Sequence, residues 1–294
     1  MTATTGDSPP AGQHQQDDVV DAHVHVWHPD RAEYPWLAEV PSLARPFDLA
    51  DVSSEQSAIG VTQLVLVQAA DNVDDTENML RAGQVHTQVA GVVAWVPIWN
   101  AASAAVLLDR WAAEPVVGVR HLVHRDPDPD LLLSRGVGEV FDLLAERTLT
   151  FDVCAETSHL LGLVPTLAED HADLTLIVDH LGKPPIRTRG WNPWAQQLAE
   201  AARAPNVVTK LSGLNTAAGP CATSDDYAPY VEHALTVFGP ERVMYGGDWP
   251  FALQAAASYT QIWRQLRGCL DTLDDQARHA VLSGTARRVY GLTC

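Results

Sequence analysis

The feature that most constrains the fold of this chain is a short apolar run, rich in β-branched residues, that recurs eight times. The runs cover residues 19–26, 63–68, 91–97, 116–122, 149–155, 174–181, 206–212 and 242–248. Most are followed by segments whose apolar residues repeat with the period of a helix, such as AVLLDRWAAE and VGEVFDLLAER. Apolar strands that alternate with helices are typical of a parallel sheet that is buried on both faces.

Two α/β architectures have this alternation, a closed (β/α)8 TIM barrel and an open, doubly wound sheet. The barrel uses eight strands, leaves no edge strand and needs about 250 residues, which suits a chain of 294. No glycine-rich GxGxxG motif follows the first run, as it does in many doubly wound sheets. We therefore predict one (β/α)8 barrel domain over residues 18–294, after a disordered tail at residues 1–17.

Composition narrows the range of partners. The formal net charge is −18 and the acidic residues are spread along the sequence, which disfavours nucleic acid and anionic membranes as partners. No run approaches 18 apolar residues, the four cysteines form no CxxC pair, and the first 17 residues lack the regions of a signal peptide. We expect a cytoplasmic protein that acts on a small molecule, with a homo-oligomer as an open alternative.

Residues suited to metal binding or acid–base chemistry end three of the predicted strands. His23 and His25 in DAHVHVWH are two residues apart, so they point to the same side of a strand, and this spacing suits one metal ion. Asp179 and His180 end the sixth run, and Asp248 ends the eighth in MYGGDWP. Each motif alone also fits a structural role, because strand-end polar residues are often solvated or bonded to the backbone.

The barrel changes how these motifs are interpreted together. The C-terminal ends of the strands form the active-site face of such a barrel, and its first and eighth strands are neighbours. His23, His25, His180 and Asp248 are therefore expected to converge on one point across the barrel mouth.

The motifs DAHVHVW, YPWL, GVRHLVHRDPDPDLL, VDHLGKPPI, NVVTKLSGL, MYGGDWP and SGTARRVYGL together resemble the amidohydrolase superfamily. Within it they are most similar to the amidohydrolase-2 group of lactone hydrolases, in particular to L-fuconolactonase-like and L-rhamnonolactonase-like members. The resemblance covers nearly all of the chain from about Asp21. It implies metal-assisted hydrolysis of a sugar aldonolactone such as L-fucono- or L-rhamnonolactone.

The resemblance also implies roles for the residues at the strand ends. His23, His25, His180 and Asp248 match residues that surround one divalent metal ion, for which we expect Zn²⁺, although some lactonases of this group work without a metal. Asp248 matches the base that activates water. His180 is either a ligand or a hydrogen-bond partner of the substrate carbonyl.

Seven further residues are predicted to bind the substrate, because a sugar lactone needs polar contacts and an aromatic wall. They are Trp27, Trp36, Arg120, His121, His124, Lys183 and Trp249. Arg120 and Lys183 match positions that face substrate oxygens in the family. Trp111, Trp194 and Trp263 are expected to pack in the core.

The middle strands depart from the superfamily members that bind two metals. The fourth run ends in Arg120-His121 and the fifth in Cys154-Ala155-Glu156, so no second complete ligand set is visible and we expect one metal at most. Glu156 is either a further ligand or a solvated carboxylate, and Cys154 either a zinc ligand or a buried apolar residue. The role of Lys210 in the seventh run is open.

Three other functions compete with a sugar lactonase. A lactonase acting on dicarboxylate lactones or muconolactones is one, because Arg125 could bind a second carboxylate. A decarboxylase with the same four residues is another, disfavoured by the LGKPP and KLSG segments. A barrel that only binds its ligand is the third, disfavoured because all four residues of the site are present.

Overall fold

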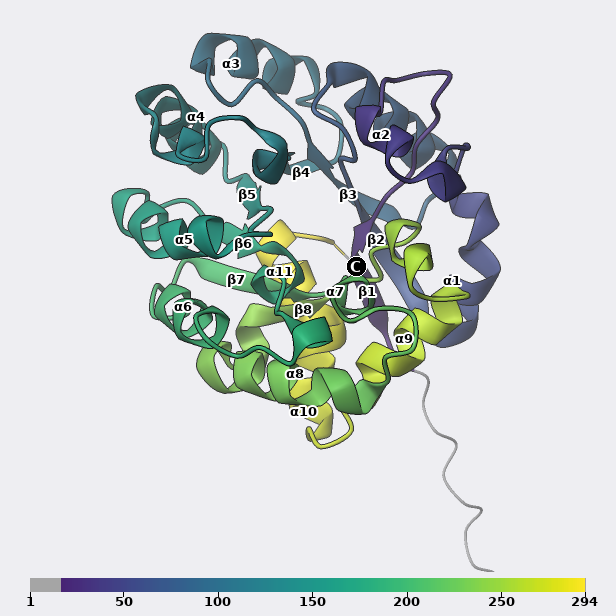
Figure 1. The fold of residues 1–294 in the computed structure, drawn as a ribbon. Helices are drawn as coiled ribbons and strands as arrows, with labels where there is room; N and C mark the ends of the chain where they lie inside the picture. Colours follow the sequence, from purple (N-terminus) through teal and green to yellow (C-terminus); the bar gives the residue numbers. More distant parts are fainter. Residues whose placement is uncertain (1–16, 294) are drawn as a thin grey trace, which may run out of the picture.

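Eight parallel strands alternate with helices and close into a barrel in the computed structural model, which describes residues 17–293. The strands are β1 (Val19–Val24), β2 (Val61–Val67), β3 (Val89–Ala94), β4 (Val116–His121), β5 (Thr150–Val153), β6 (Leu176–Val178), β7 (Val207–Leu211) and β8 (Val243–Tyr245). Beyond β8 the chain returns to β1, where the amide of His25 donates to the carbonyl of Trp249 over 2.7 Å. The predicted (β/α)8 TIM barrel is confirmed (Figure 1).

Most of the helices surround the barrel in Figure 1, whereas α7 and α11 are drawn over its middle. They are α1 (Ser53–Ile59), α2 (Val73–Val85), α3 (Ala101–Arg110), α4 (Arg135–Glu146), α5 (Ser158–Asp170), α6 (Trp194–Ala201), α7 (Leu214–Ala218), α8 (Ser224–Phe238), α9 (Tyr259–Gly268), α10 (Asp275–His279) and α11 (Thr285–Tyr290). In α4, Val137, Val140, Phe141 and Leu144 are buried at helical spacing, so one face of the helix covers the sheet. Asn72 and Thr157 accept hydrogen bonds from the first turns of α2 and α5, which fixes where these helices begin.

The barrel interior consists of an apolar layer beneath a charged one. The apolar layer comprises Val20, Ala22, Val65, Val67, Val93, Ile177, Val208 and Met244, with Ala286 and Tyr290 of α11 packed against it. Asp179 follows Ile177 by two residues, and Lys210 follows Val208 by two. Because side chains alternate along a strand, these charges share the inner face, nearer the C-terminal ends of the strands.

The sixth strand is shorter than predicted. It was expected at residues 174–181, but β6 ends at Val178, and Asp179–Gly182 form a turn. His180 and Leu181 have φ of 55° and 54° in the left-handed region, which ends strand pairing. The apolar pattern of VDHL cannot distinguish such a turn from a strand.

The long segment after β1 is tied to the mouth of the barrel. It contains three short 3-10 helices, η1 (Pro35–Ala38), η2 (Pro41–Leu43) and η3 (Leu49–Asp51). Trp27 forms an antiparallel bridge with Phe47, and the Trp36 indole donates to the carbonyl of Ala69 over 2.8 Å. The segment therefore forms a wall of the mouth, which is a common role of a long loop in a compact domain.

Two further predictions concern the core and the N-terminal tail. Trp111, Trp194 and Trp263 are buried, which confirms their assignment to the core. The predicted tail at residues 1–17 lies outside the described residues except for Asp17, whose carboxylate lies 3.0 Å from the Arg267 guanidinium. Within residues 17–293, none of the helices has the length and apolar character needed to cross a membrane.

Candidate active site

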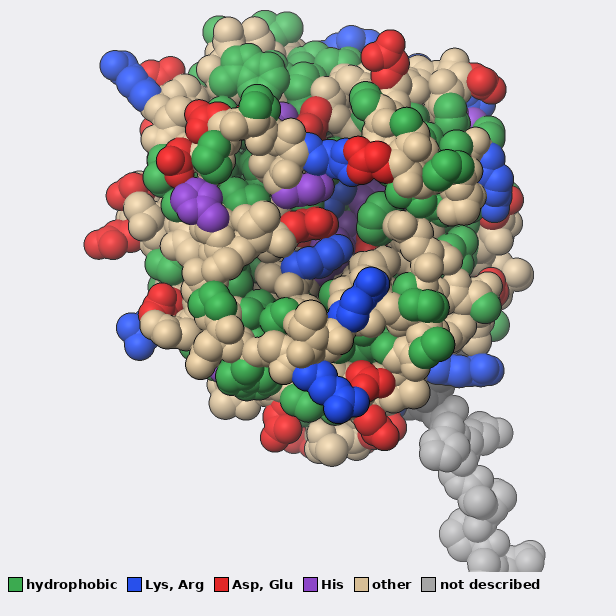
Figure 2. Space-filling model, viewed as in Figure 1, with side chains coloured by type: hydrophobic (Ala, Val, Ile, Leu, Met, Phe, Trp, Pro, Cys, Tyr) green, Lys and Arg blue, Asp and Glu red, His purple; other side chains and the backbone are tan. Residues whose placement is uncertain are grey.

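A cavity of about 140 Å³ opens at the C-terminal ends of the strands. It is lined by His25, Trp27, Trp36, Ala69, Arg120, Leu122, His124, Arg125, Cys154, Glu156, His180, Asp248 and Phe251. In Figure 2 histidine, acidic and basic side chains gather around a hollow in the middle of this face. The lining thus combines aromatic rings with charged groups, which suits a small polar ligand that has an apolar face.

His23 of β1 and His25, which follows the end of this strand, lie side by side at the floor of the cavity. Their ring centroids are 4.9 Å apart, and His23 is fully buried while His25 borders the cavity. Nδ1 of His25 lies 2.7 Å from the carbonyl oxygen of Val67 and donates to it, because a carbonyl only accepts. The other nitrogen, Nε2, lies 3.4 Å from Oδ1 of Asp248. Such backbone bonds orient histidines that bind metals.

His180 reaches the same point from the turn after β6. Its ring centroid is 4.7 Å from that of His23, and its Nδ1 lies 2.7 Å from the hydroxyl of Ser212. Gly213 follows with φ of +60°, and a Cβ at that position would lie 2.7 Å from Nδ1 of His180 and 2.9 Å from Oδ2 of Asp248. Only glycine leaves room there for both functional side chains.

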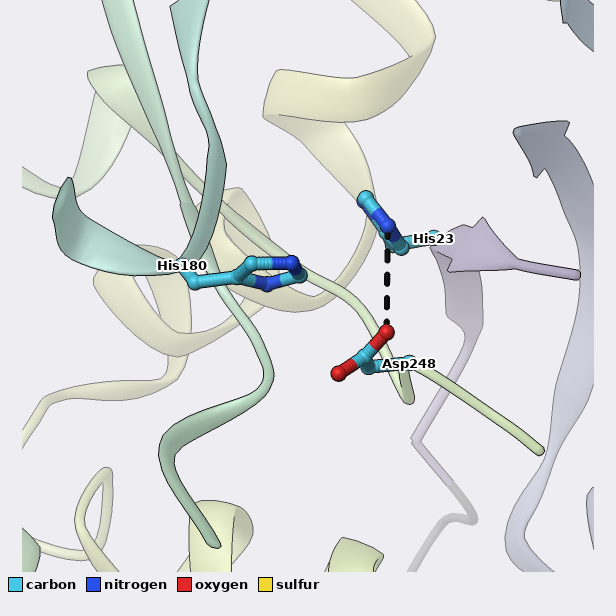
Figure 3. Close-up of side chains that lie close together, drawn as sticks. All are labelled: His23, His180 and Asp248. Atoms are coloured by element: carbon cyan, nitrogen blue, oxygen red, sulfur yellow. Dashed lines mark ion pairs between the residues drawn. The ribbon is translucent and has the colours of Figure 1, made fainter. Parts of the chain in front are cut away.

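Asp248 completes the group just beyond β8. Its backbone is left-handed, with φ of 53°, and its amide donates to the carbonyl of His23 over 2.7 Å. Oδ1 is 3.9 Å from Nε2 of His23 (Figure 3), whereas Oδ2 is buried without a hydrogen-bond partner among the described residues. A buried carboxylate oxygen in this state can receive a proton or bind a ligand.

Electrostatics favour a charged Asp248 and neutral imidazoles. Burial alone would raise the pKa of the Asp248 carboxyl, but the nearby rings of His180, His25 and His23 hold it below its ordinary value. Burial and the Lys210 ammonium lower the pKa of His23 well below its ordinary value. Burial also lowers the pKa of His180 to about 4, despite the opposing effect of Asp248. Near neutral pH the site therefore presents one carboxylate with neutral rings of His23 and His180.

These residues fit a divalent metal ion. Ligand atoms of His23, His180 and Asp248 all lie within 4.8 Å of one another, and Nε2 of His25 lies 3.4 Å from the same carboxylate. Neutral imidazoles and a carboxylate are ligands of Zn²⁺. An ion held there would lie near the positive charge of Arg120, because Nη1 of Arg120 lies 3.3 Å from Nε2 of His23.

A network of buried charges supports His23 from below. Arg120 donates to Asp179 over 2.9 Å, and the Lys210 ammonium contacts both Asp152 and Asp179. The same ammonium lies 3.2 Å from Nδ1 of His23. The sequence left the role of Lys210 open. In the structure this fully buried ammonium balances the charges of Asp152 and Asp179 beneath His23.

The predicted substrate contacts fall into two groups. Trp27, Trp36, Arg120 and His124 line the cavity. Lys183 is not part of the lining, but its ammonium lies 3.3 Å from the cavity residue Glu156.

His121 and Trp249 lie apart from the cavity lining. His121 is buried between Asp71 and Asp126, and its Nδ1 accepts from the Trp95 indole over 3.1 Å. The Trp249 ring packs against Phe47 with centroids 5.7 Å apart. His121 follows the cavity residue Arg120 in β4, so the alternation of strand side chains turns it away. Trp249 lies beyond the end of β8, where the left-handed backbone of the preceding Asp248 has already broken the strand pattern.

The sequence did not single out Ser212 and Gly213. Their side-by-side placement under His180 depends on the turn after β6, which the strand pattern did not predict. The signal was present in KLSGL, where a serine and a glycine end a buried strand. Phe251, which adds to the aromatic wall, lies one residue beyond the MYGGDWP motif.

The chain is similar in sequence to a known protein family and to two enzymes of known activity. Residues 20–292 match the family model described as Amidohydrolase. An L-fucono-1,5-lactonase of Burkholderia multivorans is 31% identical, over 93% of this chain and 96% of that protein. An L-fucono-1,5-lactonase of Burkholderia ambifaria is 29% identical, over 92% and 94% respectively.

A solved structure agrees with this match. A crystal structure of an amidohydrolase from Burkholderia multivorans with bound zinc superimposes with a TM-score of 0.85 at 28% identity. The match covers 94% of this chain and 100% of that one.

Proposed function

Because the chain belongs to the amidohydrolase family, we propose that it is a lactonase that hydrolyses a neutral sugar lactone such as L-fuconolactone. The observation that carries the proposal is the buried Asp248 carboxylate at the cavity floor, with His23, His25 and His180 grouped around it. The similarity to two L-fucono-1,5-lactonases over more than nine-tenths of the chain supports the substrate class.

The site contains the groups that lactone hydrolysis requires. The reaction needs an attacking water, a polarised carbonyl and a proton for the leaving ring oxygen. Asp248 accepts a proton from the water as it attacks, and returns it to the ring oxygen as the C–O bond breaks. Its lowered pKa makes it a weak base, so the water must also be made more acidic. A divalent ion held by His23, His180 and Asp248 would lower the pKa of water and polarise the carbonyl.

The hydrogen bond between His180 and Ser212 sets what the outer nitrogen of His180 can do. If Nδ1 donates to the serine hydroxyl, Nε2 has a lone pair and suits metal binding. If the hydroxyl donates to Nδ1, Nε2 carries hydrogen and suits a hydrogen bond to the lactone carbonyl. A serine can fill both roles, so the same ring serves a site with or without metal.

The charges around the cavity favour a neutral substrate. Arg120 is paired with the buried Asp179, Lys183 with Glu156, and Arg125 with Glu39. A substrate carboxylate would have to displace one of these internal partners. The hydroxyls of a sugar lactone need only hydrogen bonds, which Glu156 and His124 offer from the wall, while Trp27 and Trp36 offer aromatic surface.

Arg125 supports a second candidate, a lactone that carries a carboxylate. Its guanidinium makes two 3.1 Å hydrogen bonds to Glu39, but both side chains are substantially exposed. Exposed pairs contribute little, so Arg125 could exchange Glu39 for a substrate carboxylate at small cost. This would suit a muconolactone or a dicarboxylate lactone.

A screen with a pH indicator tests the proposal, because each lactone opened releases a proton. Aldonolactones, muconolactones and a pyrone dicarboxylate lactone are compared with and without a chelator. We expect the fastest turnover with L-fucono- or L-rhamnonolactone. Fast turnover of a dicarboxylate lactone instead would favour the second candidate. No lactone turnover, together with release of carbon dioxide from an aromatic carboxylate, would favour a decarboxylase and refute the proposal.

A further inference from the structure

A second group of metal-ligand side chains lies on the wall of the same cavity. Ligand atoms of His124, Cys154 and Glu156 all lie within 4.8 Å of one another, and the three side chains line the cavity together. His124 lies on η4 (Val123–Arg125), which follows β4, and the other two residues follow β5. The group shares no residue with His23, His180 and Asp248.

The backbone after β5 brings two of these ligands to one side. Asp152 and Cys154 are two residues apart, and Cys154 continues the inner face of the strand toward the mouth. The amides of Ala155 and Glu156 then donate to the carbonyls of Val153 and Cys154, over 2.8 and 2.9 Å. Each bond closes a three-residue turn, so the chain curls and Glu156 also borders the cavity.

The donor atoms have few other partners. Nδ1 of His124 is buried and has no hydrogen-bond partner among the described residues. The Cys154 side chain is buried, and within residues 17–293 no hydrogen bond of its sulfur is found. A buried ring nitrogen without a partner is unfavourable unless a ligand satisfies it. Only Glu156 has a strong partner, the Lys183 ammonium at 3.3 Å.

We propose that His124, Cys154 and Glu156 form a second metal site, selective for Zn²⁺ or another thiophilic divalent ion. One nitrogen, one sulfur and one oxygen ligand favour such an ion over Mg²⁺ or Ca²⁺, which prefer oxygen ligands alone. Three protein ligands leave a fourth position that faces the cavity, as in zinc sites that bind a substrate or water. Cys154 binds as the thiolate, and its proton is released to solvent.

Lys183 allows the proposal to predict the direction of a change in metal affinity. Its ammonium pairs with Glu156 and would repel an ion bound to the same carboxylate. Removing that charge with Lys183→Met should therefore tighten metal binding. If Glu156 only paired with Lys183 and bound no metal, the same substitution would have no such effect.

Cobalt titration of the metal-free full-length protein tests the site without any activity measurement. Co²⁺ bound by a thiolate gives a charge-transfer band in the near ultraviolet, whereas Co²⁺ on imidazoles and carboxylates alone does not. We expect this band in the wild-type protein and its loss when Zn²⁺ displaces cobalt. Cys154→Ser should abolish the band, and Glu156→Gln should weaken cobalt binding by more than about tenfold. Cys269→Ser, which changes a partly buried cysteine outside the cavity lining, is the matched control and should keep the band.

Two results would overturn the proposal. One is a wild-type protein without the thiolate band at saturating cobalt, and the other is a band that survives Cys154→Ser. A measurement without variants checks the same point, because Zn²⁺ should protect Cys154 from alkylation, as mapped by mass spectrometry. Equal alkylation with and without Zn²⁺ would contradict the site. None of these readouts depends on lactone turnover, so the proposed function and this inference can fail separately.

Discussion

The clearest consequence of the geometry concerns Gly213, which lies beneath His180 and Asp248. Alanine at this position would place a Cβ 2.7 Å from Nδ1 of His180 and 2.9 Å from Oδ2 of Asp248. Contacts below 3.0 Å are not tolerated, and neither side chain can retreat far because both are buried. At least one functional group must therefore shift by several tenths of an ångström or more.

The expected cost has two parts. A left-handed residue with a Cβ costs about 1–2 kcal/mol relative to glycine, and this lowers the free energy of unfolding. Displacement of the reacting groups by about 1 Å costs about a hundredfold in rate. We therefore predict that Gly213→Ala lowers kcat/KM for the best lactone by about a hundredfold, with a modest loss of stability.

Gly291 offers a matched control. Its φ of +63° is close to the +60° of Gly213, but a Cβ there would meet nothing within 4 Å. Gly291→Ala should therefore lose similar stability in urea unfolding and keep its activity. If the two variants had equal kcat/KM, the positions of His180 and Asp248 would not limit turnover, and the proposed site would be wrong.

Three further predictions test the charges and the metal. Lys210→Met removes the buried ammonium between Asp152 and Asp179 and should lower the free energy of unfolding by about 3–5 kcal/mol. The control Arg135→Met breaks an exposed ion pair with Glu139 and should leave urea unfolding nearly unchanged. Equal effects of the two substitutions would contradict a stabilising role of the buried charges. Burial lowers the pKa of His180 from 6.5 to about 4, so between these pH values the folded metal-free protein binds fewer protons than the unfolded chain. The free energy of unfolding should therefore fall as the pH drops from 6.5 to about 4. His180→Asn should flatten this part of the stability profile, and an unchanged profile would exclude His180 as its source. If His23, His180 and Asp248 work with a metal ion, chelation should slow lactone hydrolysis and Zn²⁺ should restore it. Full activity of the metal-free protein would indicate instead that Nε2–H of His180 donates a hydrogen bond to the lactone carbonyl.

The sequence predicted the architecture well because the signal for it is repeated. Eight apolar runs give eight strands, and the strand ends carry His23, His25 and Asp248 to one face whatever the details of the loops. The convergence on His180 was also predicted, although the sixth strand ends three residues earlier than its apolar pattern suggests. Barrel topology therefore places these side chains even where a boundary is wrong.

Details that depend on packing between distant segments could not be predicted. His121 and Trp249 are predicted to bind the substrate, but in the structure His121 lies against Asp71 and the Trp249 ring packs against Phe47. Gly213 matters only because His180 lies 2.7 Å from the place of its missing Cβ, a contact across two strands. No local pattern in the sequence encodes that distance.

The ligand atoms near the ends of the middle strands could not be predicted for the same reason, because they come from separate segments. The sequence showed no second complete ligand set because His124 comes from one segment, and Cys154 and Glu156 from another. Their spacing along the chain has none of the regularity of an HxH pair. Only the approach of η4 to the end of β5 places the three ligand atoms within 4.8 Å.

The most direct test of Asp248 as the base of a sugar lactonase is the rate of L-fuconolactone hydrolysis by the wild-type protein and by Asp248→Asn. Asparagine keeps the size of the side chain but cannot accept and return the proton of the attacking water. We predict rapid ring opening by the wild-type protein and a loss of about 10²–10⁴-fold in kcat/KM for the variant, with a cooperative urea transition to show that the variant is folded. A variant that hydrolyses the lactone at the wild-type rate would contradict the role of Asp248, and a wild-type protein that opens no sugar lactone would contradict the proposed function.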